Sequence, residues 1–264
     1  MNIKIVVATH KKYQMPSDAM YLPLHVGHAG KVDLGYTGDD TGDNISEKNL
    51  TFCELTGLYW AWKNLDADYV GLAHYRRHFF YSKKTKNPFD NVLLQNEAEQ
   101  LLSEHKILVP KKRRYYIESL YSHYAHTLDG KHLDKARESI VRLCPEYLKA
   151  FDGVMQQTGG YLFNMMVMPK VLLNEYCDWL FKILFDLESQ GLEKGLDAFN
   201  ARLYGRVSEI LFNVWLQYKS DKGELKEKDI CEVNYIHMEK IDWLRKIYSF
   251  LMAKFFGKKY EKSF

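Results

Sequence analysis

Two histidines and two arginines stand together in the segment His74-Tyr75-Arg76-Arg77-His78. The preceding residues 69–73 are mostly apolar and predict a buried strand, so the group stands at the carboxyl end of that strand. Two adjacent guanidinium groups can hold phosphate oxygens by paired hydrogen bonds and can neutralise a diphosphate leaving group without a metal ion. An imidazole could add a hydrogen-bond donor or a proton. The alternative is a solvated basic turn that pairs with the acidic residues of segment 39–47.

A second polar group, Thr9, His10 and Lys11, follows another apolar segment, residues 3–8. In open α/β sheets, ligands bind outside the carboxyl ends of the strands, so this loop stands where a nucleotide would bind. The chain has neither the glycine-rich dinucleotide fingerprint nor the P-loop motif, which argues against a dehydrogenase and a P-loop nucleotidase. Polar loops after strands are common, so a purely structural loop is the alternative.

Other polar residues could contact a ligand farther along the chain. Asn164 is the single polar residue between two apolar stretches of segment 161–168, which predicts a buried strand. A buried amide must find hydrogen-bond partners, either in the protein or in a ligand. Segment 115–131 is rich in Tyr and His without the spacing of a metal site, so Tyr124 and His126 could instead form the wall of a ligand site.

Carboxylates near predicted helix ends are candidates for a general base. Asp152 ends one predicted helix and Glu209 begins another. Either could instead interact only with the helix dipole. Asp39, Asp40 and Asp43 could bind Mg²⁺, but they stand in a turn-rich loop and are interpreted first as turn residues.

Predicted strands alternate with predicted helices along the chain. The strands are expected at residues 3–8, 68–73, 106–110 and 161–168, and the helices at 51–64, 90–104, 134–155, 170–190, 207–218 and 239–256. Segment 134–155 could be one helix or two short ones, with a break near Pro145. Thr51 and Glu54 have the spacing of a capping box. This order predicts an α/β fold with a mainly parallel central sheet. A charged linker at 220–229 would separate a domain of residues 1–220 from a C-terminal extension, residues 221–264.

The composition is that of an ordinary globular protein. The 264 residues carry a net charge of +3 and have a pI near 8.4, too weak a basic balance to indicate nucleic-acid binding. The four cysteines include no close pair, which argues against a zinc site and a disulfide framework. The first residues do not resemble a signal peptide, and no apolar run reaches about 18 residues, so a cytoplasmic location is expected.

Two basic segments could bind further partners. The predicted helix at 239–256 mixes large apolar residues with cations, a pattern typical of a helix on an anionic membrane surface. A helix docked on the protein with a basic outer face is the alternative. Residues 111–114, Lys-Lys-Arg-Arg, are similar to a nucleic-acid patch, but one four-residue run is usually a solvated loop.

Seven short blocks of the sequence form a recognisable pattern. They are THK at 9–11, GDNISxKN at 42–49, CELTGLYWAWKN at 53–64, GLxHYRR at 71–77, YxxNMM at 161–166, YCxWLF at 176–181 and SExL at 208–211. Together they resemble a bacterial family of exopolysaccharide and capsular-polysaccharide biosynthesis glycosyltransferases, long labelled a domain of unknown function. The likeness extends over roughly residues 1–220.

The resemblance implies transfer of a sugar, galactose or galactofuranose in some members, from a UDP-sugar to a growing lipid-linked glycan. Our main hypothesis is that this transfer is metal-independent and proceeds with inversion. It implies a GT-A-like fold without an evident Asp-x-Asp metal motif, so no cofactor is expected, although Mg²⁺ or Mn²⁺ could take part. The donor-binding residues that it implies are Thr9, His10, Asn44, Arg76 and Arg77. Glu209 is the expected base, with His74 as an accessory catalytic residue. Asn164 falls on the acceptor side, where Tyr124 and His126 are also expected.

Two other classes of function remain open at this point. A non-catalytic scaffold of a polysaccharide assembly complex would keep the fold but need no base. A nucleic-acid-binding protein would rest on the basic run at 111–114 and the basic C-terminal segment alone, and it would bind with a steep salt dependence.

Overall fold

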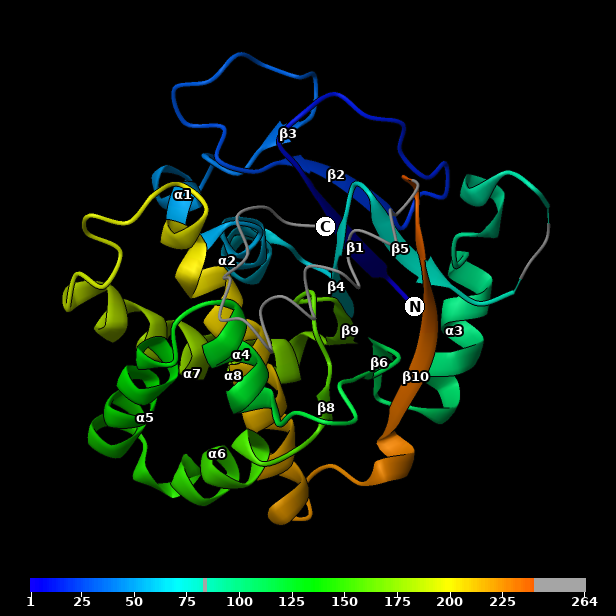
Figure 1. Cartoon of the computed structure of the whole chain (residues 1–264). Coiled ribbons are helices and arrows are strands. Elements are labelled where there is room, and N and C mark those ends of the chain that lie inside the picture. The colour runs from blue at the N-terminus through cyan, green and yellow to red at the C-terminus, as the bar shows by residue number, and fades with distance from the viewer. Residues whose placement is uncertain (83–84, 240–264) are drawn as a thin grey trace.

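A mixed sheet forms the centre of the molecule (Figure 1). The structure, a computed structural model, describes residues 1–82 and 85–239. Within them the main sheet has the order β3-β2-β1-β4-β5-β10-β6-β9, and β7 pairs with β8 in a small separate sheet. The strands are β1 (Ile3–Thr9), β2 (Tyr21–His25), β3 (Thr37–Gly38), β4 (Tyr69–His74), β5 (Arg77–Phe80), β6 (Ile107–Pro110), β7 (Arg113–Arg114), β8 (Gly159–Gly160), β9 (Met166–Pro169) and β10 (Ile230–His237).

The prediction of a mainly parallel sheet is wrong in its detail. β1 runs parallel to β2 and to β4, β2 runs parallel to β3, and β10 runs parallel to β6. However, β4 turns directly back into β5, and β9 runs antiparallel to both β4 and β6. Gly71 of β4 permits the close approach of β9, because a Cβ atom there would lie 2.7 Å from the carbonyl oxygen of Met166.

Helices cover both faces of the sheet, with α3 on one face and most other helices on the other (Figure 1). Successive side chains of a strand point to opposite faces. In β1, accordingly, Ile3, Ile5 and Val7 enter the apolar cluster shared with α3, whereas Val6 and Ala8 enter the larger cluster. The helices are α1 (Asn49–Phe52), α2 (Leu55–Asn64), α3 (Gln95–Glu104), α4 (Leu120–Thr127), α5 (Lys131–Leu143), α6 (Leu148–Met155), α7 (Lys170–Ser189) and α8 (Leu203–Asp221).

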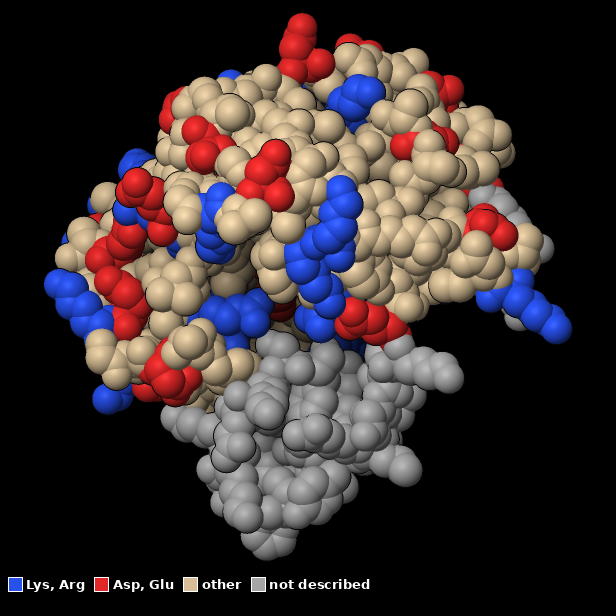
Figure 2. Space-filling view, turned by 90° about the horizontal axis from the view of Figure 1, so that it is seen from above, with Lys and Arg blue, Asp and Glu red and all other residues tan. Residues whose placement is uncertain are grey.

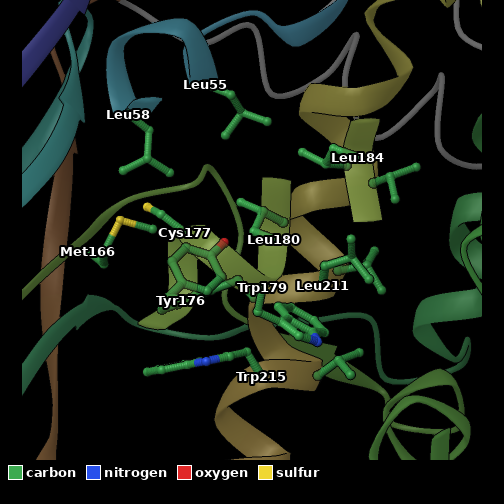
Figure 3. Packing of buried hydrophobic residues seen from close by; sticks show 14 of the residues in the cluster. Leu55, Leu58, Met166, Tyr176, Cys177, Trp179, Leu180, Leu184, Leu211 and Trp215 are labelled. Atoms are coloured by element: carbon green, nitrogen blue, oxygen red, sulfur yellow. The ribbon is translucent and has the colours of Figure 1, made fainter. Parts of the chain in front are cut away.

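Helices α7 and α8 pack against each other in the larger cluster (Figure 3). Tyr176 of α7 and Trp215 of α8 are fully buried, with ring centroids 5.4 Å apart. Burial of such a side chain contributes roughly 1.5–3 kcal/mol. This packing fixes the position of α8, the helix that carries Glu209.

The helix predicted over residues 51–64 is broken at Cys53. Cys53 has φ 54° and ψ −131°, which separates α1 from α2. Thr51 donates a hydrogen bond to the carbonyl of Lys48, and Glu54 bonds to a distant side chain, so the predicted capping box is absent. The Asn49 side chain instead donates to the Cys53 carbonyl at 2.7 Å. The break leaves the Glu54 carboxylate outside the helical pattern.

The strand predicted over 161–168 forms only from Met166 onward. Phe163 and Asn164 have φ of 76° and 52°, in the left-handed region. Asparagine enters this region readily, whereas phenylalanine does so rarely. Asn164 therefore lies in a strained turn before β9 and not inside a strand, as the sequence pattern predicted.

The sheet continues beyond the predicted linker at 220–229. β10 follows that segment and pairs with both β5 and β6. The predicted boundary after residue 220 therefore does not coincide with an edge of the sheet. The helix predicted over 239–256 lies outside the described residues except for its first position. Over residues 1–82 and 85–239, no helix is long and apolar enough to cross a membrane.

Candidate active site

The basic cluster after β4 forms a tight β-hairpin. β4 ends at His74, and Arg77 begins β5, so these two residues pair across the hairpin. Because adjacent strand residues point to opposite sides, the predicted cluster is divided. His74, Arg76 and Arg77 line a cavity, whereas His78 is fully buried in the core.

The cavity has a volume of about 250 Å³ and lies beyond the carboxyl ends of β1 and β4. The hairpin forms one wall, and the α1–α2 junction and the segment before α8 form the others. Its charged and histidine lining residues are His10, Glu54, His74, Arg76, Arg77 and Arg202. Guanidinium groups suit a phosphate-bearing ligand, and a carboxylate suits hydroxyl groups.

The strained turn at Phe163 and Asn164 touches the site at four points. The Phe163 carbonyl lies 2.6 Å from Nε2 of His74, and its backbone N–H bonds to the Glu209 carboxylate. The Phe163 ring lies 3.8 Å from the Arg77 guanidinium carbon. The Asn164 side chain donates to Glu54 at 2.7 Å. Backbone strain costs about 1–3 kcal/mol per residue and persists where several contacts hold it, most often at functional sites.

Glu209 stands in surroundings that suit a general base. Burial, and secondly the negative charge of Glu54, raise the pKa of Glu209 to about 7. Arg77, the Phe163 backbone and Arg113 oppose this rise. A base works best when its pKa lies near the working pH, because it is then both ionised and able to hold a proton.

The opposite side of the site is cationic. Nε of Arg77 is buried and has no hydrogen-bond partner within the described part of the chain. Burial lowers the pKa of Arg77. Arg76 is 39% exposed, with a guanidinium nitrogen 3.7 Å from Glu239. Figure 2 shows Lys and Arg side chains gathered in the middle of the face seen from above. A buried guanidinium N–H without a hydrogen-bond acceptor favours an anionic ligand.

His10 lies at the mouth of this positive region. Its ring packs edge-on against the ring of Tyr75, with centroids 5.3 Å apart. Burial lowers the pKa of His10, and the charges of Lys11, Arg76 and Arg202 lower it further. His10 therefore stays neutral at neutral pH and can offer a hydrogen bond beside the arginines.

Comparison with known families decides where the chain belongs. Residues 4–220 match the family described as "Domain of unknown function (DUF4422)". The chain belongs to this family. The matched region contains the whole cavity lining described above.

The DUF4422 chain is also similar to a solved structure, the apo form of the bifunctional glycosyltransferase WbbM. The TM-score is 0.83 at 33% sequence identity, over 91% of this chain and 46% of the WbbM chain. The chain thus spans about half the length of that protein. A search of curated proteins gave no match.

Two of the predicted donor residues of the DUF4422 chain do not line the cavity. Thr9 is buried, and its hydroxyl donates to the Lys11 carbonyl at 2.7 Å, so it shapes the loop that carries His10. The Asn44 side chain bonds to the backbone of Gly42 and Ser46. Both residues therefore support loops around the site in this structure.

The predicted acceptor residues Tyr124 and His126 both lie on α4. Tyr124 is buried, and its hydroxyl lies 3.3 Å from His132. Burial raises the pKa of Tyr124, with smaller effects from Arg206 and Glu209, which places its ring near the base. His126 is exposed, and its Nδ1 lies 2.7 Å from the Glu118 carboxylate.

The other carboxylates of the sequence analysis have structural partners. Asp39 accepts hydrogen bonds from the backbone of Gly27 and His28, as expected of a turn residue. Asp152 forms a paired ion contact with Arg137 at 2.7 and 2.9 Å on the surface. Residues 1–82 and 85–239 contain no group of three or more His, Cys, Asp or Glu side chains arranged to hold a metal ion.

Sequence reasoning missed Arg202 and Glu54. Arg202 donates to the Cys53 sulfur at 3.2 Å and lines the cavity. The sequence does indicate the position of Arg202, because Arg202, Arg206 and Glu209 have the i, i+4, i+7 spacing that places side chains on one face of a helix. Glu54 had no such signal, because it was interpreted as the partner of Thr51 in a helix cap.

Proposed function

We propose that the protein is a glycosyltransferase that transfers a sugar from a UDP-sugar to a growing lipid-linked capsular or exopolysaccharide glycan. Membership of the DUF4422 family and the similarity to bifunctional WbbM support the class of reaction. The observation that carries the proposal is a cavity lined by Arg76, Arg77 and Glu54, with Glu209 behind this lining, where it interacts with Arg77 and Glu54 and has a pKa of about 7. The GT-A-like assignment and a galactose or galactofuranose donor belong to the same proposal.

The proposed reaction proceeds with inversion. Glu209 accepts the proton of an acceptor hydroxyl, whose oxygen forms a bond to the anomeric carbon of the donor sugar. The bond from that carbon to the diphosphate oxygen breaks, and the electron pair leaves with UDP. Arg76 and Arg77 stabilise the negative charge that develops on the diphosphate, a role that a metal ion fills in other enzymes. His10 contributes a hydrogen bond to the same group.

Other parts of the proposal concern the surroundings of the reaction. Tyr124 and His126 would lie on the acceptor side, with His74 supporting the site from the hairpin. A cytoplasmic location, with peripheral contact to an anionic membrane through the C-terminal segment, would bring the protein to a lipid-linked acceptor. Nucleic acid is not part of the proposal.

A panel of UDP-sugars tests the proposal. One donor should raise the thermal unfolding temperature without Mn²⁺, and Arg76→Ala should weaken that effect. Glu209→Gln should abolish turnover while the donor still binds. No stabilisation by any donor, with or without Mn²⁺, together with intact polysaccharide production by Arg76→Ala cells, would reject the proposal. Unchanged polysaccharide production by Glu209→Gln cells would instead indicate a non-catalytic scaffold.

A further inference from the structure

Asn164 is buried and uses its whole side chain within the protein. It is 1% exposed. Its amide donates to the Glu54 carboxylate at 2.7 Å and to the Gly205 carbonyl at 2.9 Å. Its oxygen lies 2.9 Å from the hydroxyl of Ser208. Both amide hydrogens are therefore donated within the protein, and the buried amide oxygen already accepts one hydrogen bond, so the side chain has no donor left for a substrate.

These contacts join two parts of the site that are distant in sequence. Glu54 precedes α2, whereas Gly205 and Ser208 belong to the first turns of α8, directly before Glu209. The turn that carries Asn164 is strained, with φ of 52° at this residue. The strain and the three hydrogen bonds of the buried Asn164 side chain indicate that the position of Glu54 is specified and not incidental.

Glu54 lines the cavity in which the proposed donor would bind. It lines the same cavity as Arg76, Arg77 and Arg202. Its charge also affects the pKa of Glu209, so it stands close to the proposed base. The anomeric carbon must lie between the diphosphate and the base, and the sugar ring therefore passes this carboxylate.

We propose that Glu54 binds hydroxyl groups of the transferred sugar, and that Asn164 is the positioning residue that holds the Glu54 carboxylate for this task. This inference rests on the proposed function. An ionised carboxylate only accepts hydrogen bonds, so it fits neighbouring hydroxyl groups of a sugar and repels the phosphates. Asn164, predicted from the sequence as an acceptor ligand, acts here through Glu54 instead of touching the substrate.

Binding of UDP and of UDP-sugar separates this role from a general effect on the donor. In Glu54→Gln, affinity for the UDP-sugar should fall about 10- to 100-fold, as expected for loss of a hydrogen bond to a charged group. Affinity for UDP alone should not fall, because the substitution removes a negative charge from beside the arginines. Equal losses for both ligands, or no loss for either, would overturn the inference.

Asn164→Ala, like Glu54→Gln, should reduce the preference for UDP-sugar over UDP, because the Glu54 carboxylate loses the hydrogen bond that positions it. The matched control is Asn213→Ala. Asn213 is also a buried asparagine of three hydrogen bonds, to Tyr161 twice and to the Glu209 carbonyl, but none reaches Glu54. Asn213→Ala should lower the stability of the protein and leave its preference for UDP-sugar over UDP unchanged. If Asn164→Ala does not fold, Glu54→Gln alone decides.

The result also distinguishes this inference from the proposed function. Wild-type protein that binds UDP but gains no affinity from the attached sugar would overturn the role of Glu54 and keep the proposed nucleotide site. Wild-type protein that binds neither ligand would overturn the proposed function, and the inference with it. Titration calorimetry with UDP and with each UDP-sugar measures all of these outcomes.

Discussion

Nε2 of His74 lies 2.6 Å from the carbonyl oxygen of Phe163, 89 residues later in the chain. A carbonyl oxygen only accepts hydrogen bonds, so the imidazole must donate from Nε2. Burial lowers the pKa of His74, which keeps the ring neutral at neutral pH. With its Nε2 proton committed to the backbone, His74 is better suited to holding the strained turn than to accepting a proton from a substrate.

Replacement of His74 should therefore act on structure more than on the pH dependence of the reaction. His74→Ala should lower the free energy of unfolding by about 1–2 kcal/mol, because the Phe163 carbonyl loses its donor. The residual turnover should still rise with pH and reach a plateau above about pH 7, because the rising part of the pH–rate profile reflects ionisation of Glu209. A pH–rate profile of His74→Ala that has lost this limb would instead make His74 the base.

The two arginines of the hairpin should contribute unequally to donor binding. Nε of Arg77 is buried and has no hydrogen-bond partner within the described chain, and its guanidinium stacks on Phe163, whereas the Arg76 side chain is 39% exposed and pairs with Glu239. Arg77→Ala should thus weaken UDP binding by about 10- to 100-fold, the range expected for loss of hydrogen bonds to a charged group. Arg76→Ala should weaken UDP binding less.

Arginine variants are best compared by calorimetry with UDP at two salt concentrations. Arg77→Lys should recover little of the affinity, because an ammonium group cannot make paired bonds to a phosphate. Arg137→Ala is the control, since Arg137 pairs with Asp152 away from the cavity. Equal effects of Arg76→Ala and Arg77→Ala would contradict the unequal roles.

Local sequence patterns correctly predicted the strands that consist of an uninterrupted run of mostly buried apolar residues. β1, β4 and β6 are apolar runs, and the predicted strands at 3–8, 68–73 and 106–110 are confirmed. The predicted interruption of the helix at 134–155 near Pro145 is likewise confirmed by α5 and α6. β10 was missed because its sequence mixes polar and apolar residues, and it joins the sheet through partners more than 100 positions earlier in the chain.

Contacts between distant segments account for the parts of the site that the sequence did not predict. Cys53 ends α1 without Gly or Pro, because packing against Gly205 and the Asn49 side chain override the helical preference of the segment. Glu54 enters the site through Asn164, 110 residues later. Neither contact leaves a periodic pattern in the sequence, so a window of neighbouring residues cannot reveal it.

Glu209 should make the stability of the protein decrease as the pH rises. A carboxyl group titrates at about 4.3 in an unfolded chain, whereas the pKa of Glu209 is about 7 in the folded protein. The folded state therefore binds the proton more tightly, and stability is lost between about pH 4 and 7 as the unfolded state releases it first. Glu209→Gln removes this loss and should be more stable than wild type at pH 8 by about 1–3 kcal/mol.

Urea unfolding of wild type and Glu209→Gln at several pH values measures this difference. The gain should shrink as the pH falls and approach zero below about pH 4, where Glu209 is protonated in both the folded and the unfolded state. Glu47→Gln is the control, because Glu47 is exposed on the surface. A gain of constant size from pH 5 to 8 would show that Glu209 does not have a raised pKa.

Two glycines should respond in opposite directions to replacement by alanine. At Gly71 the added Cβ would lie 2.7 Å from the Met166 carbonyl and 2.8 Å from a Val167 methyl group. β9 would have to move away from β4, and this overpacking should cost about 1–3 kcal/mol. In α6, Gly153 has open space at the Cβ position, so Gly153→Ala should stabilise the protein by about 0.5–1 kcal/mol.

The displacement of β9 should also reach the site. Met166 stands two residues after Asn164, so Gly71→Ala should disturb the strained turn and weaken UDP-sugar binding along with stability. Gly153→Ala should leave binding unchanged, because α6 does not line the cavity. Thermal unfolding with and without UDP-sugar measures both effects, and a Gly71→Ala protein of wild-type stability would contradict the close contact between β4 and β9.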